Sequence, residues 1–139
     1  MEYKKFKDKI FVRIDSGEEI VESLTNLCKK LDIKAGTISG IGATNNATIG
    51  LFDIKAKKYL SREIVGDHEI IPVYGNISTM NNEPYLHLHI NLCNSENKSF
   101  GGHLNSAIVS ATFEGVIDII DGKIERKYDD KSGLNLLKL

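Results

Sequence analysis

The chain has 139 residues, 41% of them hydrophobic and 27% charged, the proportions of an ordinary globular domain that can bury its own core. Its 18 basic and 19 acidic residues are interspersed and give a net charge of −1, so the chain has no overall positive field for binding a polyanion and no long basic run. No apolar run approaches the roughly 18 residues of a membrane span, and no signal-like segment opens the chain. We therefore expect one domain over residues 1–139, in the cytoplasm and without a membrane partner.

The first predicted elements are a strand over residues 9–14 and a helix. Ser16-Gly17-Glu18-Glu19 matches a capping box, with the Ser16 hydroxyl at the helix N-terminus. Behind it, apolar residues recur at helical spacing: Ile20, Val21, Leu24, Leu27, Cys28 and Leu31. The pattern predicts one amphipathic helix that buries the Cys28 thiol.

The rest of the chain predicts a series of short strands. They cover residues 36–42, 47–52, 57–65, 69–80, 85–93, 99–103, 107–120 and 123–128. Asn45-Asn46 is a predicted turn, and Asp121-Gly122 predicts a hairpin. The leucine-rich tail, residues 133–139, is expected to pack on the body or on a partner chain. One main helix on a largely antiparallel sheet, with the helix supplying the long crossover, is an α+β architecture.

Three of the four histidines fall in one short stretch, at His87, His89 and His103. Residues i and i+2 of a strand share a face, so His87 and His89 project together. A five-residue loop that pairs Cys93 with Ser99 sets His89 directly opposite His103. Cross-strand Cβ atoms lie about 4.5–5.5 Å apart, and a slip of one residue would move His103 to the other face. The sequence therefore predicts a site where three imidazoles converge on a metal.

The predicted ligand set favours zinc. Neutral imidazole binds Zn²⁺ at about 2.0–2.1 Å, and three histidines leave the fourth tetrahedral position open. Nickel, copper and iron remain alternatives at an all-nitrogen site. Cys93 shares the histidine face and is an alternative further ligand. Gly101-Gly102 predicts a bulge or a close approach of strands that aims His103.

Three polar residues are candidates for supporting roles. Glu114, in the following strand, could orient a ligand histidine or act on metal-activated water, and its alternative is a solvated or ion-paired carboxylate. Asn105 and Ser106 follow His103 closely and could bind an anionic ligand, and their alternative is an ordinary turn role.

Five segments occur in an informative order along nearly the whole chain. They are Arg13-Ile14-Asp15-Ser16-Gly17-Glu18-Glu19, Ala35-Gly36-Thr37-Ile38-Ser39-Gly40-Ile41-Gly42, His87-Leu88-His89-Ile90, Phe100-Gly101-Gly102-His103-Leu104 and Thr112-Phe113-Glu114. This order resembles the PPC (plant and prokaryote conserved) domain family in its stand-alone prokaryotic form. The resemblance implies an α+β domain that assembles as a homotrimer, with the histidines holding zinc. It also implies the label of DNA-binding protein, which derives largely from plant relatives with separate AT-hook motifs. This chain has no Arg-Gly-Arg hook.

Three hypotheses for function follow. The first is a zinc-binding protein whose open site suits a small ligand or metal-activated water, with the question of enzymatic activity left open. The second is a DNA-binding or DNA-associated regulatory protein, which rests on the resemblance. The third is a structural oligomerisation module in which zinc only stabilises the fold. The expected partners are further copies of the chain, a small molecule at the metal and, under the second hypothesis, DNA.

Overall fold

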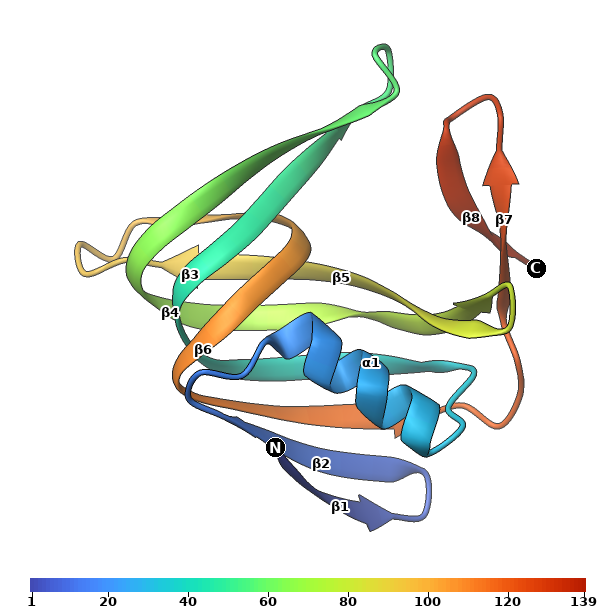
Figure 1. The fold of residues 1–139 in the computed structure, drawn as a ribbon, viewed down its shortest axis with the longest axis horizontal. Helices are drawn as coiled ribbons and strands as arrows, with labels where there is room; N and C mark the ends of the chain where they lie inside the picture. Colours follow the sequence, from blue (N-terminus) through green and yellow to red (C-terminus); the bar gives the residue numbers. More distant parts are fainter.

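Eight strands and one helix make up residues 1–139 in the computed structural model, and the helix lies against one face of the sheet (Figure 1). In chain order they are β1 (Glu2–Phe6), β2 (Lys9–Asp15), α1 (Ile20–Lys30), β3 (Gly36–Asp53), β4 (Lys58–Met80), β5 (Glu83–Cys93), β6 (Ser99–Ile119), β7 (Glu125–Asp129) and β8 (Leu134–Lys138). All strand pairs are antiparallel except the single contact of β4 with β7. The predicted α+β architecture is confirmed.

The four longest strands pair with one another in a closed circuit. The sheet order is β1-β2-β6-β3-β4-β7-β8, and β5 pairs with both β4 and β6. Since β3 also pairs with β4 and β6, each strand from β3 to β6 has a hydrogen-bonded neighbour on both sides. Figure 1 shows β3, β4 and β6 bending strongly to make this arrangement. The circuit fixes β5 and β6, the two strands that carry the three clustered histidines.

Several predicted pairs of short strands are single long strands. The turn expected at Asn45-Asn46 is wrong, because β3 continues through it with register shifts between Gly40 and Gly42 and between Thr44 and Asn46. Thr44 is buried there, and its hydroxyl donates to the Ile108 carbonyl at 2.6 Å. These irregularities bend the strand without ending it. The breaks expected in β4 after residue 65 and in β6 after residue 103 are absent for the same reason.

The predicted helix is confirmed, but its N-cap is Glu19 and not Ser16. The Glu19 carboxylate accepts hydrogen bonds from the backbone N–H groups of Val21 and Glu22. Gly17 has a φ of +87°, and a bridge from Glu19 to Ile108 of β6 holds the preceding residues against the sheet. The helix therefore cannot begin before Ile20.

The helix supplies the predicted crossover and one side of the core. β2 and β3 both run antiparallel to β6 and so run parallel to each other on its two sides. Helix α1 connects them and buries Leu24, Leu27 and Cys28 in a cluster of 23 buried apolar residues. The expectation of a buried Cys28 thiol is confirmed.

The two ends of the chain depart from the predictions. The expected hairpin at Asp121-Gly122 is wrong, since β7 leaves β6 and contacts β4 through Thr79 and Glu125. The tail does pack on the body, as the hairpin partner of β7. Strand β1 is an additional element at the sheet edge. All five of its residues are exposed, and its mostly polar sequence has no apolar–polar alternation that would predict a strand. No helix is long and apolar enough to cross a membrane.

Candidate metal centre

Strands β5 and β6 bring His87, His89 and His103 together. The register pairs Cys93 with Ser99 and His89 with His103, which confirms the predicted alignment of the hairpin. The ring centroids lie 5.2 Å apart for His87 and His89, 5.3 Å for His87 and His103, and 5.7 Å for His89 and His103. One ring nitrogen from each histidine lies within 4.8 Å of the other two. The three imidazoles therefore share one face and converge on a common point.

Glycines let the backbones approach closely around this point. A Cβ atom at Gly102 would lie 2.7 Å from the Gly50 carbonyl oxygen of β3, and one at Gly101 would collide with the Ile90 carbonyl of β5. Gly75 of β4 has the same relation to the His87 carbonyl. The close approach predicted from Gly101-Gly102 is confirmed.

The chemistry of the three rings fits a divalent metal. The buried Nδ1 atom of His103 has no hydrogen-bond partner in the protein. Burial, with the neighbouring His87 and His89, lowers the pKa of His103 to about 4, and burial also lowers the pKa of His87. Both rings are thus neutral near pH 7, the form that binds metals. Tetrahedral zinc has ligand nitrogens about 3.4 Å apart, and the ring nitrogens here lie within 4.8 Å of one another.

The histidines lie in a pocket of about 560 Å³ between two hairpins. The tip of the β3–β4 hairpin lines one side with Leu51, Phe52, Ile54 and Tyr59. Strand β8 lines the other side with Leu134, Asn135, Leu136 and Leu137. The Lys57 ammonium donates a hydrogen bond to the Asp130 carbonyl, so the two hairpins touch at their tips. The Tyr59 ring lies 5.2 Å from the His103 ring, centroid to centroid. The three imidazoles therefore line a pocket with largely apolar walls.

Arg126 of β7 is a further residue of this pocket that the sequence analysis missed. Its guanidinium donates to Ser78 Oγ at 2.8 Å, to the Asn135 carbonyl at 2.7 Å and to Asn76 Oδ1 at 2.7 Å. It also lies 4.7 Å from the centre of the Tyr85 ring. No local pattern distinguishes it from the charged residues beside it, because its partners come from β4, β5 and β8.

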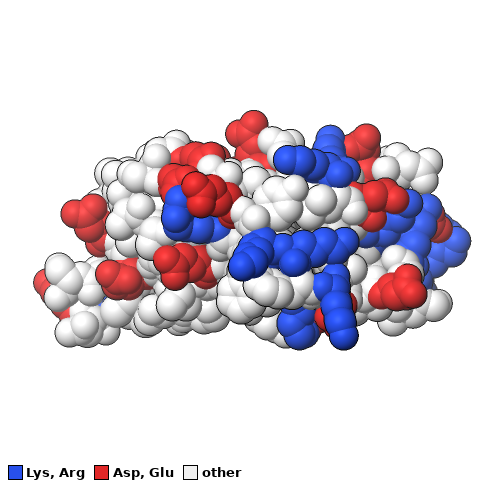
Figure 2. All heavy atoms as spheres, turned by 90° about the horizontal axis from the view of Figure 1, so that it is seen from below, with Lys and Arg blue, Asp and Glu red and all other residues white.

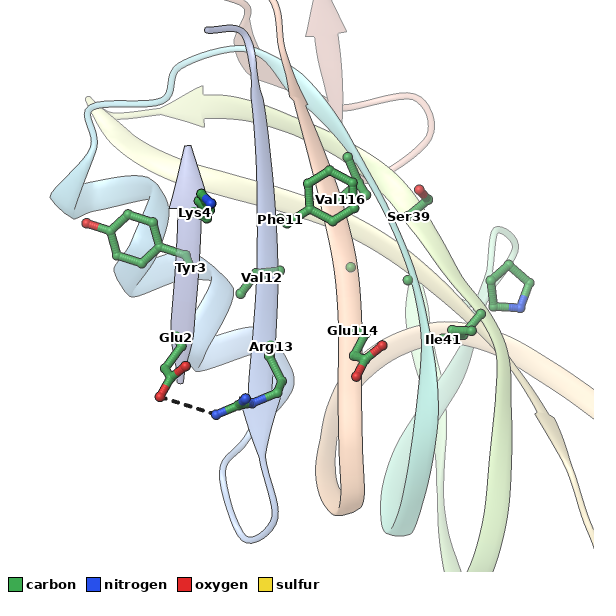
Figure 3. Close-up of a pocket in the computed structure, with 13 residues that line it drawn as sticks. Glu2, Tyr3, Lys4, Phe11, Val12, Arg13, Ser39, Ile41, Glu114 and Val116 are labelled. Carbon is green, nitrogen blue, oxygen red and sulfur yellow. Dashed lines mark ion pairs between the residues drawn. The ribbon is translucent and has the colours of Figure 1, made fainter. Parts of the chain in front are cut away.

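The structure places the other candidate residues away from the histidine pocket. Glu114 lies much further along β6, paired with Arg13 and Ile41, and Figure 3 shows it in a second groove beside Arg13. Within one chain, Glu114 is therefore not positioned to orient the histidines or to act on a group that they hold. Its neighbour Arg13 forms its ion pairs with Glu2 and Asp15.

The remaining three candidates lie near the hairpin but outside the pocket lining. Asn105 lies in a bulge of β6, between Leu104 and Ser106. Its side-chain oxygen lies beside Gly50 of β3, 3.2 Å from where a Cβ atom on that residue would be. Ser106 pairs with Thr48 of β3. The Cys93 thiol is directed to the Asn94 carbonyl at 3.8 Å, and Cys93 does not belong to the group of convergent ligand atoms.

Solved structures resemble this chain over nearly its full length. A crystal structure of a candidate DNA-binding protein from Bacteroides thetaiotaomicron is 39% identical, with a TM-score of 0.96 over 99% of this chain and 96% of that one. A metal-containing protein from Archaeoglobus fulgidus is 32% identical, with a TM-score of 0.88 over 99% and 97% of the two chains. A plant- and prokaryote-conserved (PPC) protein from Pyrococcus horikoshii is 34% identical, with a TM-score of 0.87 over 99% and 94%.

Curated relatives are more distant and much longer. The bifunctional protein GlmU of a Synechococcus strain is 25% identical over 125 residues, which are 88% of this chain but 18% of that protein. The chain thus spans about a fifth of the length of the curated relatives it matches. The sequence profile of the Plants and Prokaryotes Conserved (PCC) domain matches residues 1–121. Together with the shared fold, this match shows that the chain belongs to the PCC domain family.

Proposed function

We propose that the protein binds one Zn²⁺ ion through His87, His89 and His103 and presents it to a small ligand. The observation that carries the proposal is the convergence of three ring nitrogens within 4.8 Å on one face. The partnerless His103 Nδ1 and the Archaeoglobus relative described as metal-containing support it. A zinc ion with three protein ligands supplies Lewis-acid chemistry at its open position. The protein's own residues add a pocket with largely apolar walls around the three imidazoles.

Metal analysis of untagged protein tests this proposal. We expect about one zinc ion per chain in the wild type, and none in His89→Ala, because two imidazoles bind zinc far more weakly than three. His68→Ala is the matched control, since His68 hydrogen-bonds the Gly66 carbonyl and packs on Phe100 instead of joining the cluster. Zinc retained in His89→Ala, or absent from the wild type, contradicts the proposal.

We also propose that residues 1–139 form one domain and that three copies associate through the groove of Figure 3. This groove of about 760 Å³ lies on β1, β2, β6 and β3 and exposes 56% of Phe11 and 61% of Ile41. It also carries Arg13 and Glu114, so the same groove on a second copy offers an opposite charge to each of them.

Light scattering is expected to give a trimeric mass for the wild type and a monomeric mass for Ile41→Lys. Ile54→Lys, which changes an exposed apolar residue outside the groove, serves as the control.

Binding of DNA is a second candidate function. Some solved relatives are described as candidate DNA-binding proteins, and Figure 2 shows Lys and Arg side chains gathering over part of one face. Lys4, Lys5 and Lys7 lie on β1 and the turn after it, and Lys30 of α1 reaches over the Tyr3 ring.

A mobility-shift titration at low salt, with a Lys4→Gln, Lys5→Gln, Lys7→Gln variant, tests this candidate. Phosphate contacts predict a salt-sensitive shift that the variant weakens, and the absence of any shift excludes the candidate.

A further inference from the structure

The histidine pocket contains positive charge and no negative charge. Arg126 is the one lining residue with a full charge at neutral pH, and no Asp or Glu lines the pocket. The Arg126 charge is not neutralised elsewhere, because its three hydrogen-bond partners are uncharged groups. A divalent ion on three neutral imidazoles would add two further positive charges. The pocket is therefore electrostatically complementary to an anion.

The guanidinium of Arg126 is held in place with donors to spare. Ser78 and Asn76 of β4 and the Asn135 carbonyl of β8 accept three of its N–H groups, and the Tyr85 ring lies against its face. Arginine has five N–H donors, so one remains on each terminal nitrogen. Those two nitrogens are the pair that binds a carboxylate in bidentate fashion.

Arg126 is tied directly to the histidine cluster. Asn76, which accepts from its Nη2 atom, is the cross-strand partner of His87 in the β4–β5 register. Residues paired in this way share one face of the sheet, so the guanidinium lies on the face that carries the imidazoles.

The walls of the pocket indicate the other part of the ligand. Six apolar residues from the two hairpins line it: Leu51, Phe52, Ile54, Leu134, Leu136 and Leu137. Leu51 and Ile54 are about two-thirds exposed, at 69% and 66%, and Leu136 and Leu137 are exposed at 44% and 39%. A ligand with an apolar body would cover this surface, whereas inorganic phosphate or chloride would leave it in water.

We propose that Arg126 makes this pocket a binding site for small organic carboxylates that carry an apolar body. The proposal rests on the proposed zinc site for part of the positive charge. Arg126 is the residue that recognises the carboxylate, and the two hairpins hold the apolar part.

Calorimetric titration of the zinc-loaded full chain with benzoate and with benzamide tests the proposal. The two probes have the same ring, and only benzoate is charged. In the wild type, benzoate should bind at least about tenfold more tightly than benzamide. In Arg126→Met this preference should fall to about threefold or less, because the charged donor pair is gone. Lys127→Met is the matched control, since it removes the same charge from the neighbouring exposed position of β7 and should keep the wild-type preference.

The ratio of the two affinities separates recognition from structural damage. If Arg126 only anchors the β7–β8 hairpin, Arg126→Met will weaken both probes equally and leave the ratio unchanged, which overturns the proposal. Equal binding of both probes to wild-type protein that holds a full equivalent of zinc also overturns it and leaves the zinc site intact. Metal analysis of the same samples keeps the two proposals distinct: a chain without bound metal contradicts the zinc site, and the ratio still decides the role of Arg126.

Discussion

At the scale of single residues, Gly101 is a position where the candidate metal centre depends on the absence of a side chain. A Cβ atom there would collide with the Ile90 carbonyl, and its next neighbours are also backbone atoms of β5. Gly101→Ala must therefore push β5 and β6 apart, and we expect a loss of about 1–3 kcal/mol in the free energy of unfolding. Urea unfolding measures this loss. Gly50→Ala is the control, because its nearest atoms belong to the side chains of Asn105 and Ser61, at 3.2 and 3.3 Å, which can move aside. Equal losses in both variants would contradict the argument.

Cys28 makes a prediction about alkaline pH. Burial in the core raises the pKa of its thiol from 9.0 to about 12, so the folded protein keeps the proton that the unfolded chain releases. A pKa raised in the folded state contributes stability that is present below pH 9 and is lost as the pH rises towards 12. At pH 10 the loss is about 1.4 kcal/mol relative to pH 8. Guanidinium unfolding should show this extra decline for the wild type and not for Cys28→Ala. Parallel declines in the two proteins would mean that the thiol does not titrate in this way.

At the scale of elements, the helix is defined by a cap that also ties it to the sheet. The Glu19 carboxylate accepts from Val21 and Glu22 of α1 and from the Ala107 N–H of β6 at 2.8 Å. Glu19→Ala leaves these three backbone donors without that acceptor, and we expect it to cost about 1–2 kcal/mol of unfolding free energy. Ser16→Ala should cost much less, because the Ser16 hydroxyl donates only to the exposed Ser110 carbonyl. Thermal unfolding of both variants compares them. A larger loss in Ser16→Ala would restore the capping box read from the sequence.

Sequence patterns predict a helix or strand well when the residues that form its buried face lie close together in the sequence. The apolar stripe of α1 and the alternation around His87 and His89 each depend on residues close together in sequence, and both predictions agree with the structure. The continuity of β3 could not be predicted in this way. Asn45-Asn46 has the composition of a turn, and pairing with β4 and β6 keeps it in the strand. Arg126 was missed for the same reason, since its partners are about 50 residues away at Asn76 and Ser78. The features that could not be predicted are those that depend on pairing between residues far apart in the sequence.

At the scale of the whole molecule, the histidine cluster joins strands that the fold already holds. His89 and His103 are cross-strand partners, and β5 and β6 belong to the closed circuit formed by β3 to β6. A bound ion would therefore add stability without being needed to assemble the sheet, unlike the zinc of a zinc finger.

If the protein binds zinc as proposed, treatment with a chelator is expected to leave the far-UV circular dichroism unchanged and to lower the melting temperature. Ligand binding to the folded state alone stabilises it by about 4 kcal/mol when free zinc is 1,000 times its dissociation constant. Added zinc should restore the melting temperature of the wild type and should not change that of His89→Ala, which lacks one imidazole of the cluster. Loss of the circular dichroism signal on chelation would instead favour the purely structural role for zinc. An unchanged fold with a zinc-dependent melting temperature would favour a zinc ion that binds a ligand in the pocket formed by Arg126 and the two hairpins.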